Sequence, residues 1–208
     1  MSNSKPLFIV FEGLDGSGKS TQIRLLEQKL CEAGRAVCTT AEPTSSVTGG
    51  LIRDVLSGTN PRTSTELAGL FMTDRVAHNV NPVWGIKKQL ADGKDVISDR
   101  YYYSSFAYQG VSTDLGWVMD MNLNCPDIEK PDLCIYLDVD PDNCKKRIDG
   151  ARSHLEIFEK DANLLRSIRA KFMSVFEALP DHNILVINAD DTPDAIADKI
   201  YNQVKKLI

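Results

Sequence analysis

Short apolar runs alternate with stretches of helical spacing from one end of the chain to the other. Five such runs predict β-strands, over Leu7–Phe11, Ala36–Thr40, Asp95–Ser98, Leu133–Val139 and Ile184–Ile187. Mostly apolar strands separated by helices are typical of a parallel sheet that is buried on both faces. The sequence therefore predicts an α/β fold with a five-stranded parallel sheet and helices on both faces.

The segments between these runs place apolar residues three and four positions apart, as helices do. Helices are predicted over 19–33, 48–56, 64–79 and 82–90, after Arg100, from Pro141 to Gly150, over 159–179 and from Pro193 onwards. Ser64 is the predicted cap of the third of these helices. Residues 151–158 show no clear period, and no internal repeat or linker is visible. We expect one domain over residues 1–208, with a distinct segment near 150–160.

Composition narrows the possible partners and the compartment. The 208 residues carry a net charge of −5, which disfavours a nucleic-acid polymer as partner. No apolar run approaches membrane-spanning length, and the N-terminal MSNSKP has no leader pattern, so neither a membrane nor secretion is expected. The five cysteines include no C-x-x-C pair, which suits a reducing compartment and predicts a cytoplasmic protein. Cys31, Cys38 and Cys134 are expected to be buried as small hydrophobic residues.

The stretch GLDGSGKS at residues 13–20 follows the first strand and opens a helix. It matches the phosphate-binding pattern G-x-x-x-x-G-K-[ST], in which glycines let backbone N–H groups point at phosphate oxygens. Lys19 should reach the β- and γ-phosphates, and the Ser20 hydroxyl can bind Mg²⁺. The sequence therefore predicts binding of a nucleoside triphosphate and Mg²⁺ in a P-loop NTPase fold, through Gly13, Asp15, Gly16, Ser17, Gly18, Lys19, Ser20 and Thr21.

Three classes of P-loop protein compete at this point. A GTP-driven switch would need N-K-x-D after a late strand, and the corresponding residues 188–191 lack the lysine. A motor or helicase would normally be larger. The length favours a small-molecule kinase, although the P-loop alone does not specify the reaction.

A second chemical stretch, DRYYYSSFAYQ, follows the third predicted strand. Together with GLDGSGKST and LFMTDR, it resembles the thymidylate kinase family, and the resemblance runs nearly end to end. The resemblance implies transfer of the ATP γ-phosphoryl group to dTMP, giving dTDP for dTTP synthesis. It also implies a homodimer that acts on small-molecule substrates. A kinase for another nucleoside monophosphate, or a nucleotide-binding regulator with weakened catalysis, remains an alternative.

The same resemblance assigns residues to the acceptor. Arg100 would hold the dTMP phosphate, and Asp15 would approach the sugar 3′-OH. Phe71 would stack on thymine and Arg75 would reach its O4, with core packing and a surface ion pair as the respective alternatives. Six further residues complete the acceptor set that the resemblance implies: Glu42, Pro43, Ser104, Ser105, Tyr108 and Gln109. Asp99, at the end of the strand, would either bind Mg²⁺ or orient Arg100.

The donor side and the lid match the family less completely. Arg147 would lie over the adenine, and Ala189 belongs to the ATP site. In the lid near 150–160 the family has D-R-x-E, but Ile157 stands at the arginine position. Arg152 is therefore the candidate for a catalytic charge that bridges the two phosphates, with Arg166 and Arg169 as second choices.

Overall fold

A computed structural model describes residues 5–151, 157–158 and 161–208. Its sheet contains five strands, β1 (Phe8–Glu12), β2 (Val37–Ala41), β3 (Asp95–Asp99), β4 (Leu133–Asp138) and β5 (Ile184–Asn188). All neighbouring strands are parallel, in the order β2-β3-β1-β4-β5. The predicted five-stranded parallel sheet is confirmed.

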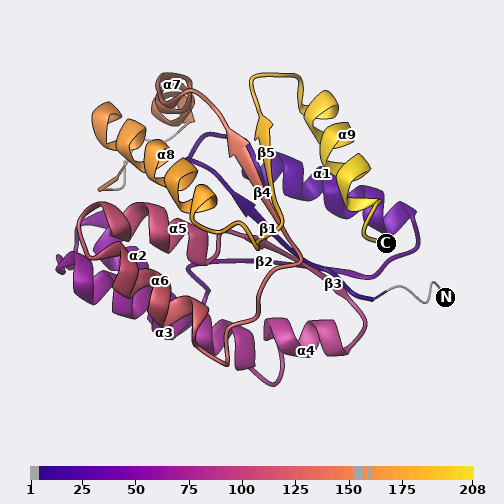
Figure 1. Cartoon of the computed structure of the whole chain (residues 1–208), viewed down its shortest axis with the longest axis horizontal. Helices are drawn as coiled ribbons and strands as arrows, with labels where there is room; N and C mark the ends of the chain where they lie inside the picture. Colours follow the sequence, from indigo (N-terminus) through magenta and orange to yellow (C-terminus); the bar gives the residue numbers. More distant parts are fainter. Residues whose placement is uncertain (1–4, 152–156, 159–160) are drawn as a thin grey trace.

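Helices connect these strands and cover both faces of the sheet. They are α1 (Lys19–Glu32), α2 (Val47–Ser57), α3 (Ser64–Val80), α4 (Ile86–Ala91), α5 (Tyr102–Tyr108), the 3₁₀ turn η1 (Gln109–Val111), α6 (Leu115–Leu123), α7 (Pro141–Ala151), α8 (Ala162–Glu177) and α9 (Pro193–Val204). Helices α1 and α9 pack together on one side of the sheet, and α5 and α8 pack together on the other (Figure 1). Helices α2 and α3 pack on each other and lie on the α5 side.

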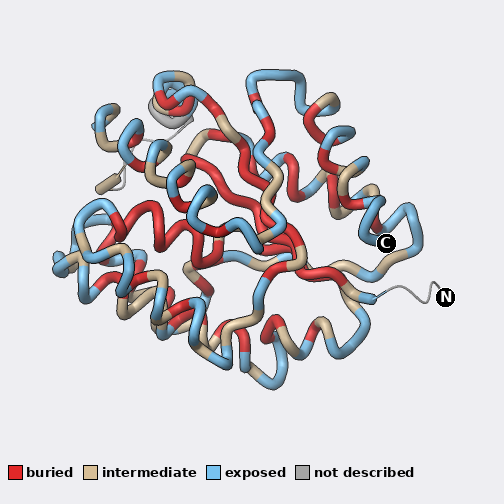
Figure 2. Tube along the Cα trace, in the orientation of Figure 1, coloured by how far each residue is buried: buried red, intermediate tan, exposed pale blue. Residues whose placement is uncertain are grey.

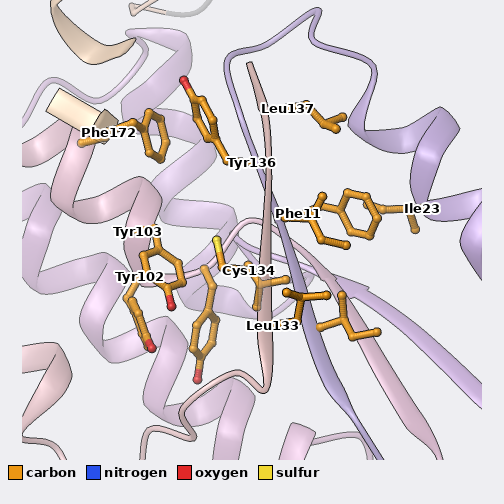
Figure 3. Packing of buried hydrophobic residues seen from close by; sticks show 14 of the residues in the cluster. Phe11, Ile23, Tyr102, Tyr103, Leu133, Cys134, Tyr136, Leu137 and Phe172 are labelled. Carbon is orange, nitrogen blue, oxygen red and sulfur yellow. The ribbon is translucent and has the colours of Figure 1, made fainter. Parts of the chain in front are cut away.

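The core lies on both sides of the three inner strands, β3, β1 and β4. Phe8, Ile9, Val10 and Phe11 of β1 have no exposed surface, which explains why that strand is apolar throughout. Figure 2 shows the inner strands as buried and the outer faces of the surrounding helices as exposed, while the edge strands β2 and β5 are mostly intermediate or exposed. In Figure 3, Tyr102 and Tyr103 lie beside Cys134, so these two tyrosines of α5 belong to the core.

Several local predictions differ from the structure. Helix α4 begins at Ile86, because residues 82–85 form a turn in which Asn81 Oδ1 accepts N–H bonds from Val83 and Trp84. Helix α6 was not predicted, since its one buried face is carried by only Val118 and Asn122.

Helix ends and cysteines supply three further corrections. Helix α7 continues through Gly150 to Ala151. Thr63, not Ser64, caps α3. Thr63 and Glu66 form a capping box, in which the Thr63 side chain accepts the Glu66 N–H and the Glu66 side chain accepts the Thr63 N–H. Cys31 is exposed and Cys38 is half-buried, so among the three cysteines expected in the core only Cys134 lies there. No helix in the described part of the chain is long and apolar enough to span a membrane.

Candidate active site

Residues 13–20 form a tight loop between β1 and α1. Gly13, Gly16 and Gly18 have φ values of 142°, 76° and 98°, and residues that carry a side chain rarely adopt these backbone conformations. A Cβ at Gly13 would lie 2.8 Å from the Leu137 carbonyl oxygen, so the backbone there requires glycine. Helix α1 begins directly after the loop, with Ser20 and the exposed Thr21 in its first turn. A helix start behind a glycine loop attracts phosphate, because its N–H groups are unpaired there.

Lys19 is buried beneath this loop. Its Nζ donates hydrogen bonds to the carbonyl oxygens of Gly13 and Leu14, both at 3.1 Å, and lies 3.9 Å from Asp15 Oδ1. Burial and the nearby charge of Arg100 hold the pKa of Lys19 below its usual value. Phosphate oxygens can replace these two carbonyl contacts, and their negative charge would favour the ammonium form.

Ser20 and Asp99 line one groove beside the loop, together with Thr44 and Arg53. The buried Oδ1 of Asp99 accepts no hydrogen bond from any residue that the structure describes. A carboxylate and a hydroxyl are the oxygen ligands that Mg²⁺ prefers, usually with several water molecules. The described residues contain no cluster of three or more His, Cys, Asp or Glu able to hold a metal. These donors therefore fit a Mg²⁺ ion that is shared with a phosphate ligand.

Arg100 follows β3 in a left-handed conformation with φ 67°. Its Nη1 donates to Ser104 Oγ at 2.9 Å, and its Nη2 lies 2.9 Å from Asp15 Oδ2. The guanidinium also lies over the Tyr108 ring, at 5.1 Å from the centroid. Burial lowers the pKa of Arg100, but the Asp15 carboxylate and other neighbours outweigh it and hold the pKa well above its usual value. Arg100 is thus a fixed cation that already pairs with an acid of the P-loop.

A cavity opens on the far side of Arg100, and we call it the main cavity. Its wall comes from β1–α1, the loop before α2, and helices α2, α3 and α5. It is lined by Asp15, Glu42, Pro43, Arg53, Leu56, Phe71, Arg75, Arg100, Tyr101, Ser104, Ser105, Tyr108, Gln109 and Phe158. All ten residues that the sequence assigned to the acceptor line this one cavity.

Arg75 lies buried at the cavity wall. Its Nε donates to Glu42 Oε2 at 2.9 Å, its Nη1 to Asn122 Oδ1 at 2.6 Å and its Nη2 to Ser105 Oγ at 3.2 Å. Its side chain is 1% exposed. The alternative of an exposed ion pair is therefore wrong. Glu42 also contacts His78 Nδ1 at 3.0 Å, so helix α3 fixes the loop that carries Glu42.

Two aromatic rings close the apolar part of the main cavity. Phe71 is half-buried and packs against the cluster formed by Ile52, Val55, Leu56 and Leu67. Phe158 contacts the same cluster and meets the Tyr108 ring edge-on, with 5.2 Å between centroids. Phe71 thus lines the cavity and also packs against a small core, so the core-packing alternative describes part of its surroundings, and stacking on thymine stays a prediction.

Arg147 and Ala189 are the two residues expected beside the nucleotide outside the P-loop. Arg147 Nη1 donates to the Gly16 carbonyl oxygen at 3.1 Å, which places helix α7 across the P-loop. Ala189 is buried, and its N–H bonds to Asp138 at the end of β4.

The lid candidate Arg152 lies outside the described residues. Of the two second choices, Arg166 pairs with Asp142 at 2.6 Å. Arg169 forms two bonds to Asp138, at 2.6 and 2.7 Å.

Several residues at the site were not predicted from the sequence, and four of them make informative contacts. Glu12, Arg53, Asn122 and Phe158 contact or line the same set of groups. Glu12 is a charged residue at the end of an apolar strand, and that position was a usable signal. Arg53 Nη1 donates to the carbonyl oxygen of Thr44 at 2.7 Å and lies on the border of the groove and the main cavity. Asn122 had no signal, since its helix was not predicted.

Glu12 has no exposed surface and accepts three hydrogen bonds. The donors are the N–H groups of Tyr101 and Ser104, at 2.9 and 3.0 Å, and the Ser104 hydroxyl, at 2.6 Å. Burial raises the pKa of the Glu12 carboxyl to about 7, against the opposing effects of Arg100 and these hydrogen bonds.

Comparison with known proteins gives one consistent result. The sequence profile of the family described as thymidylate kinase matches residues 11–200. A probable thymidylate kinase of Thermococcus onnurineus (strain NA1) is 41% identical over 211 residues, which cover 97% of each chain. A thymidylate kinase of Desulfotalea psychrophila is 36% identical over 210 residues, covering 100% of this chain and 98% of that protein. A putative thymidylate kinase of Treponema pallidum is 32% identical over 203 residues, with 96% and 95% covered.

Proposed function

The chain belongs to the thymidylate kinase family, and on that premise we propose that its P-loop holds ATP while its main cavity holds dTMP, so that the γ-phosphoryl group passes between them to give ADP and dTDP. One observation carries the arrangement. Arg100 lies in the main cavity and pairs with Asp15 of the P-loop, so the two substrate sites meet at a single cation. Two anions that must react need a positive charge at that point.

Lys19 and the N–H groups of the loop would hold the β- and γ-phosphates of ATP. The contact of Arg147 with Gly16 supports its place beside the nucleotide, and Ala189 lies at the same edge of the sheet. An arginine side chain can lie flat on an adenine ring.

Ser20 would bind Mg²⁺ through its hydroxyl group, and Asp99 would bind the ion either directly or through water. The unpaired buried oxygen of Asp99 supports this assignment over a role in orienting Arg100, because the two side chains share no hydrogen bond among the described contacts. The ion would supply neutralising charge for the phosphate oxygens.

Arg100 and Arg53 would bind the acceptor phosphate, since both guanidinium groups line the main cavity. The apolar wall of Phe71 and Phe158 suits a flat base. Three hydrogen bonds hold the Arg75 guanidinium, and among the described residues Nη1 donates to Asn122 alone, so its second N–H could serve a single oxygen such as the O4 of thymine.

The remaining acceptor residues surround the sugar. Tyr108 would pack where a 2′-OH would otherwise lie, and Asp15 would accept a bond from the 3′-OH. Ser104, Ser105 and Gln109 supply polar groups on the same helical wall, while Glu42 and Pro43 form the wall opposite.

The reaction needs no general base. The second pKa of a phosphate monoester is about 6, so the acceptor is largely a dianion near neutral pH. Catalysis then depends on bringing two anions into line and on stabilising the charge of the transferring group. Lys19 would stabilise that charge from the donor side and Arg100 from the acceptor side, and Arg152 is proposed as a third charge from the lid.

We also propose that residues 1–208 form one kinase domain with a lid near 150–160, and that the protein is a cytoplasmic homodimer. The family assignment supports these proposals. Size-exclusion chromatography with light scattering tests the dimer.

A panel of nucleoside monophosphates with ATP and Mg²⁺ tests the reaction. ADP release should require a monophosphate and should be fastest with dTMP. A preference for another monophosphate would replace the acceptor. ATP binding without ADP release for any member would instead indicate a nucleotide-binding regulator.

A further inference from the structure

Helix α5 has no cap from its own sequence. The residue before it is Tyr101, whose side chain makes no capping hydrogen bond. Glu12 supplies the missing cap from the end of β1, since its Oε1 accepts the N–H groups of both Tyr101 and Ser104. A carboxylate at a helix start satisfies N–H groups that have no partner within the helix. The residue directly before the P-loop therefore holds the start of the helix that lines the main cavity.

The second carboxylate oxygen of Glu12 makes a different contact. Glu12 Oε2 lies 2.6 Å from Ser104 Oγ, and that same Oγ accepts the bond from Arg100 Nη1. A hydroxyl group has one hydrogen and two lone pairs. When the hydrogen points at Glu12, the lone pairs are available to Arg100. Glu12 thereby sets the direction in which Ser104 can accept.

The backbone of Arg100 makes this support necessary. Its left-handed φ of 67° is disfavoured for a residue with a side chain. The Arg100 N–H bonds to the Phe11 carbonyl and the Ser98 hydroxyl bonds to the Arg100 carbonyl, both at 2.8 Å. The next N–H along the chain, that of Tyr101, belongs to Glu12. Contacts on both sides of Arg100 thus hold the turn that aims its guanidinium into the cavity.

We propose that Glu12 is a positioning residue for phosphoryl transfer, which directs Arg100 toward the acceptor phosphate through Ser104 and fixes it relative to the P-loop. The role rests on the proposed function, because it needs Arg100 to bind the acceptor. Glu12 touches neither substrate site directly, since it is fully buried and lines neither the groove nor the main cavity. Its effect must therefore pass through the Ser104 hydroxyl and the turn at Arg100.

Two substitutions separate this role from simple capping. Ser104→Ala leaves both backbone N–H bonds to Glu12 in place and removes the hydroxyl that links Glu12 to Arg100 and that also lines the main cavity. Glu12→Gln keeps one oxygen for the N–H groups of Tyr101 and Ser104 but turns an amide N–H toward the Ser104 hydroxyl. This amide N–H then competes with Arg100 for the lone pairs of Ser104 Oγ. Glu32→Gln makes the same chemical change at an exposed position of α1 and serves as the matched control.

Steady-state kinetics are measured for each variant and for the double variant, with circular dichroism and ATP binding as checks of folding. Each single change should lower kcat/KM for dTMP roughly tenfold or more, as expected for a hydrogen bond to a charged group. KM for ATP should change by less than about twofold, since no group on the donor side is altered. The double variant should lose no more than the worse single variant, because both changes break one chain of contacts.

Three results would overturn the positioning role. Unchanged dTMP kinetics in folded Ser104→Ala would show that the link has no effect, and this variant decides the matter even where Glu12→Gln fails to fold. Losses that multiply in the double variant would show that Ser104 acts on dTMP directly and Glu12 elsewhere. If the wild-type protein releases no ADP with dTMP, the proposed function itself fails, and the positioning role fails with it.

Discussion

The free energy of unfolding of this protein should fall as the pH rises from about 4.5 to about 7, because of the buried carboxyl group of Glu12. In the unfolded chain this carboxyl releases its proton near its ordinary pKa of 4.5, whereas in the folded protein burial raises the pKa to about 7. Between these values the folded state binds one more proton than the unfolded state. Stability therefore decreases with rising pH in this window and is independent of Glu12 titration outside it.

The size of the effect follows from the two pKa values. Each pKa unit corresponds to about 1.4 kcal/mol, so the interval from 4.5 to about 7 corresponds to roughly 3 kcal/mol. That is a large share of the roughly 5–15 kcal/mol that stabilises a typical domain. Other acids titrate in the same range, so the contribution of Glu12 has to be isolated by comparison with a variant that cannot ionise.

Urea unfolding of the wild-type protein and of Glu12→Gln, at closely spaced pH values across the window, provides that comparison. The difference in free energy of unfolding, wild type minus variant, should decrease by roughly 3 kcal/mol as the pH rises. The exposed control Glu32→Gln should show no such trend. A difference that stays flat or increases with pH would refute the reasoning, because it would mean that Glu12 ionises at or below its ordinary pKa within the folded protein.

Three further changes test the site. Arg100→Ala should lower kcat/KM for dTMP about a hundredfold or more, as expected for loss of a fixed charge at the reacting groups. The affinity for ATP should stay near that of the wild type. Unchanged dTMP kinetics would show that Arg100 does not belong to the acceptor site. Phe71→Ala should raise KM for dTMP roughly tenfold through loss of base stacking, with calorimetry checking that the protein stays folded, since global unfolding would instead favour a purely structural role. Arg75→Ala leaves Glu42 buried without its arginine partner and should lower the free energy of unfolding in urea by about 3–5 kcal/mol. A decrease below about 1 kcal/mol would contradict the importance of the pair of Arg75 and Glu42.

Much of the fold was predictable because its signals are local. The five strands are apolar runs, and the P-loop is a contiguous pattern of glycines followed by Lys19 and Ser20. The DRYYYSSFAYQ stretch likewise placed Arg100, Ser104, Ser105 and Tyr108 on one short segment, and these residues do line one cavity. Short-range patterns of this kind survive without knowledge of the tertiary contacts.

The parts that were not predictable depend on contacts between distant residues. Glu12 caps a helix that begins 90 positions later in the chain, so no window of sequence could show it. Helix α6 carries few buried residues, and Asn122 matters only because Arg75 reaches it from α3. Cys31 and Cys38 were misplaced because burial statistics for a residue type do not show which helix or strand face it occupies.

The buried contacts of Arg75 also bear on how the base site binds. Its guanidinium is held by Glu42, Asn122 and Ser105, and these three contacts select its rotamer. Ordering a long side chain on binding otherwise costs about 0.5–1.5 kcal/mol. On the proposed function, the base would therefore meet a preorganised recognition group. A base that cannot match the second N–H of Nη1 would leave a polar group unsatisfied and would bind more weakly.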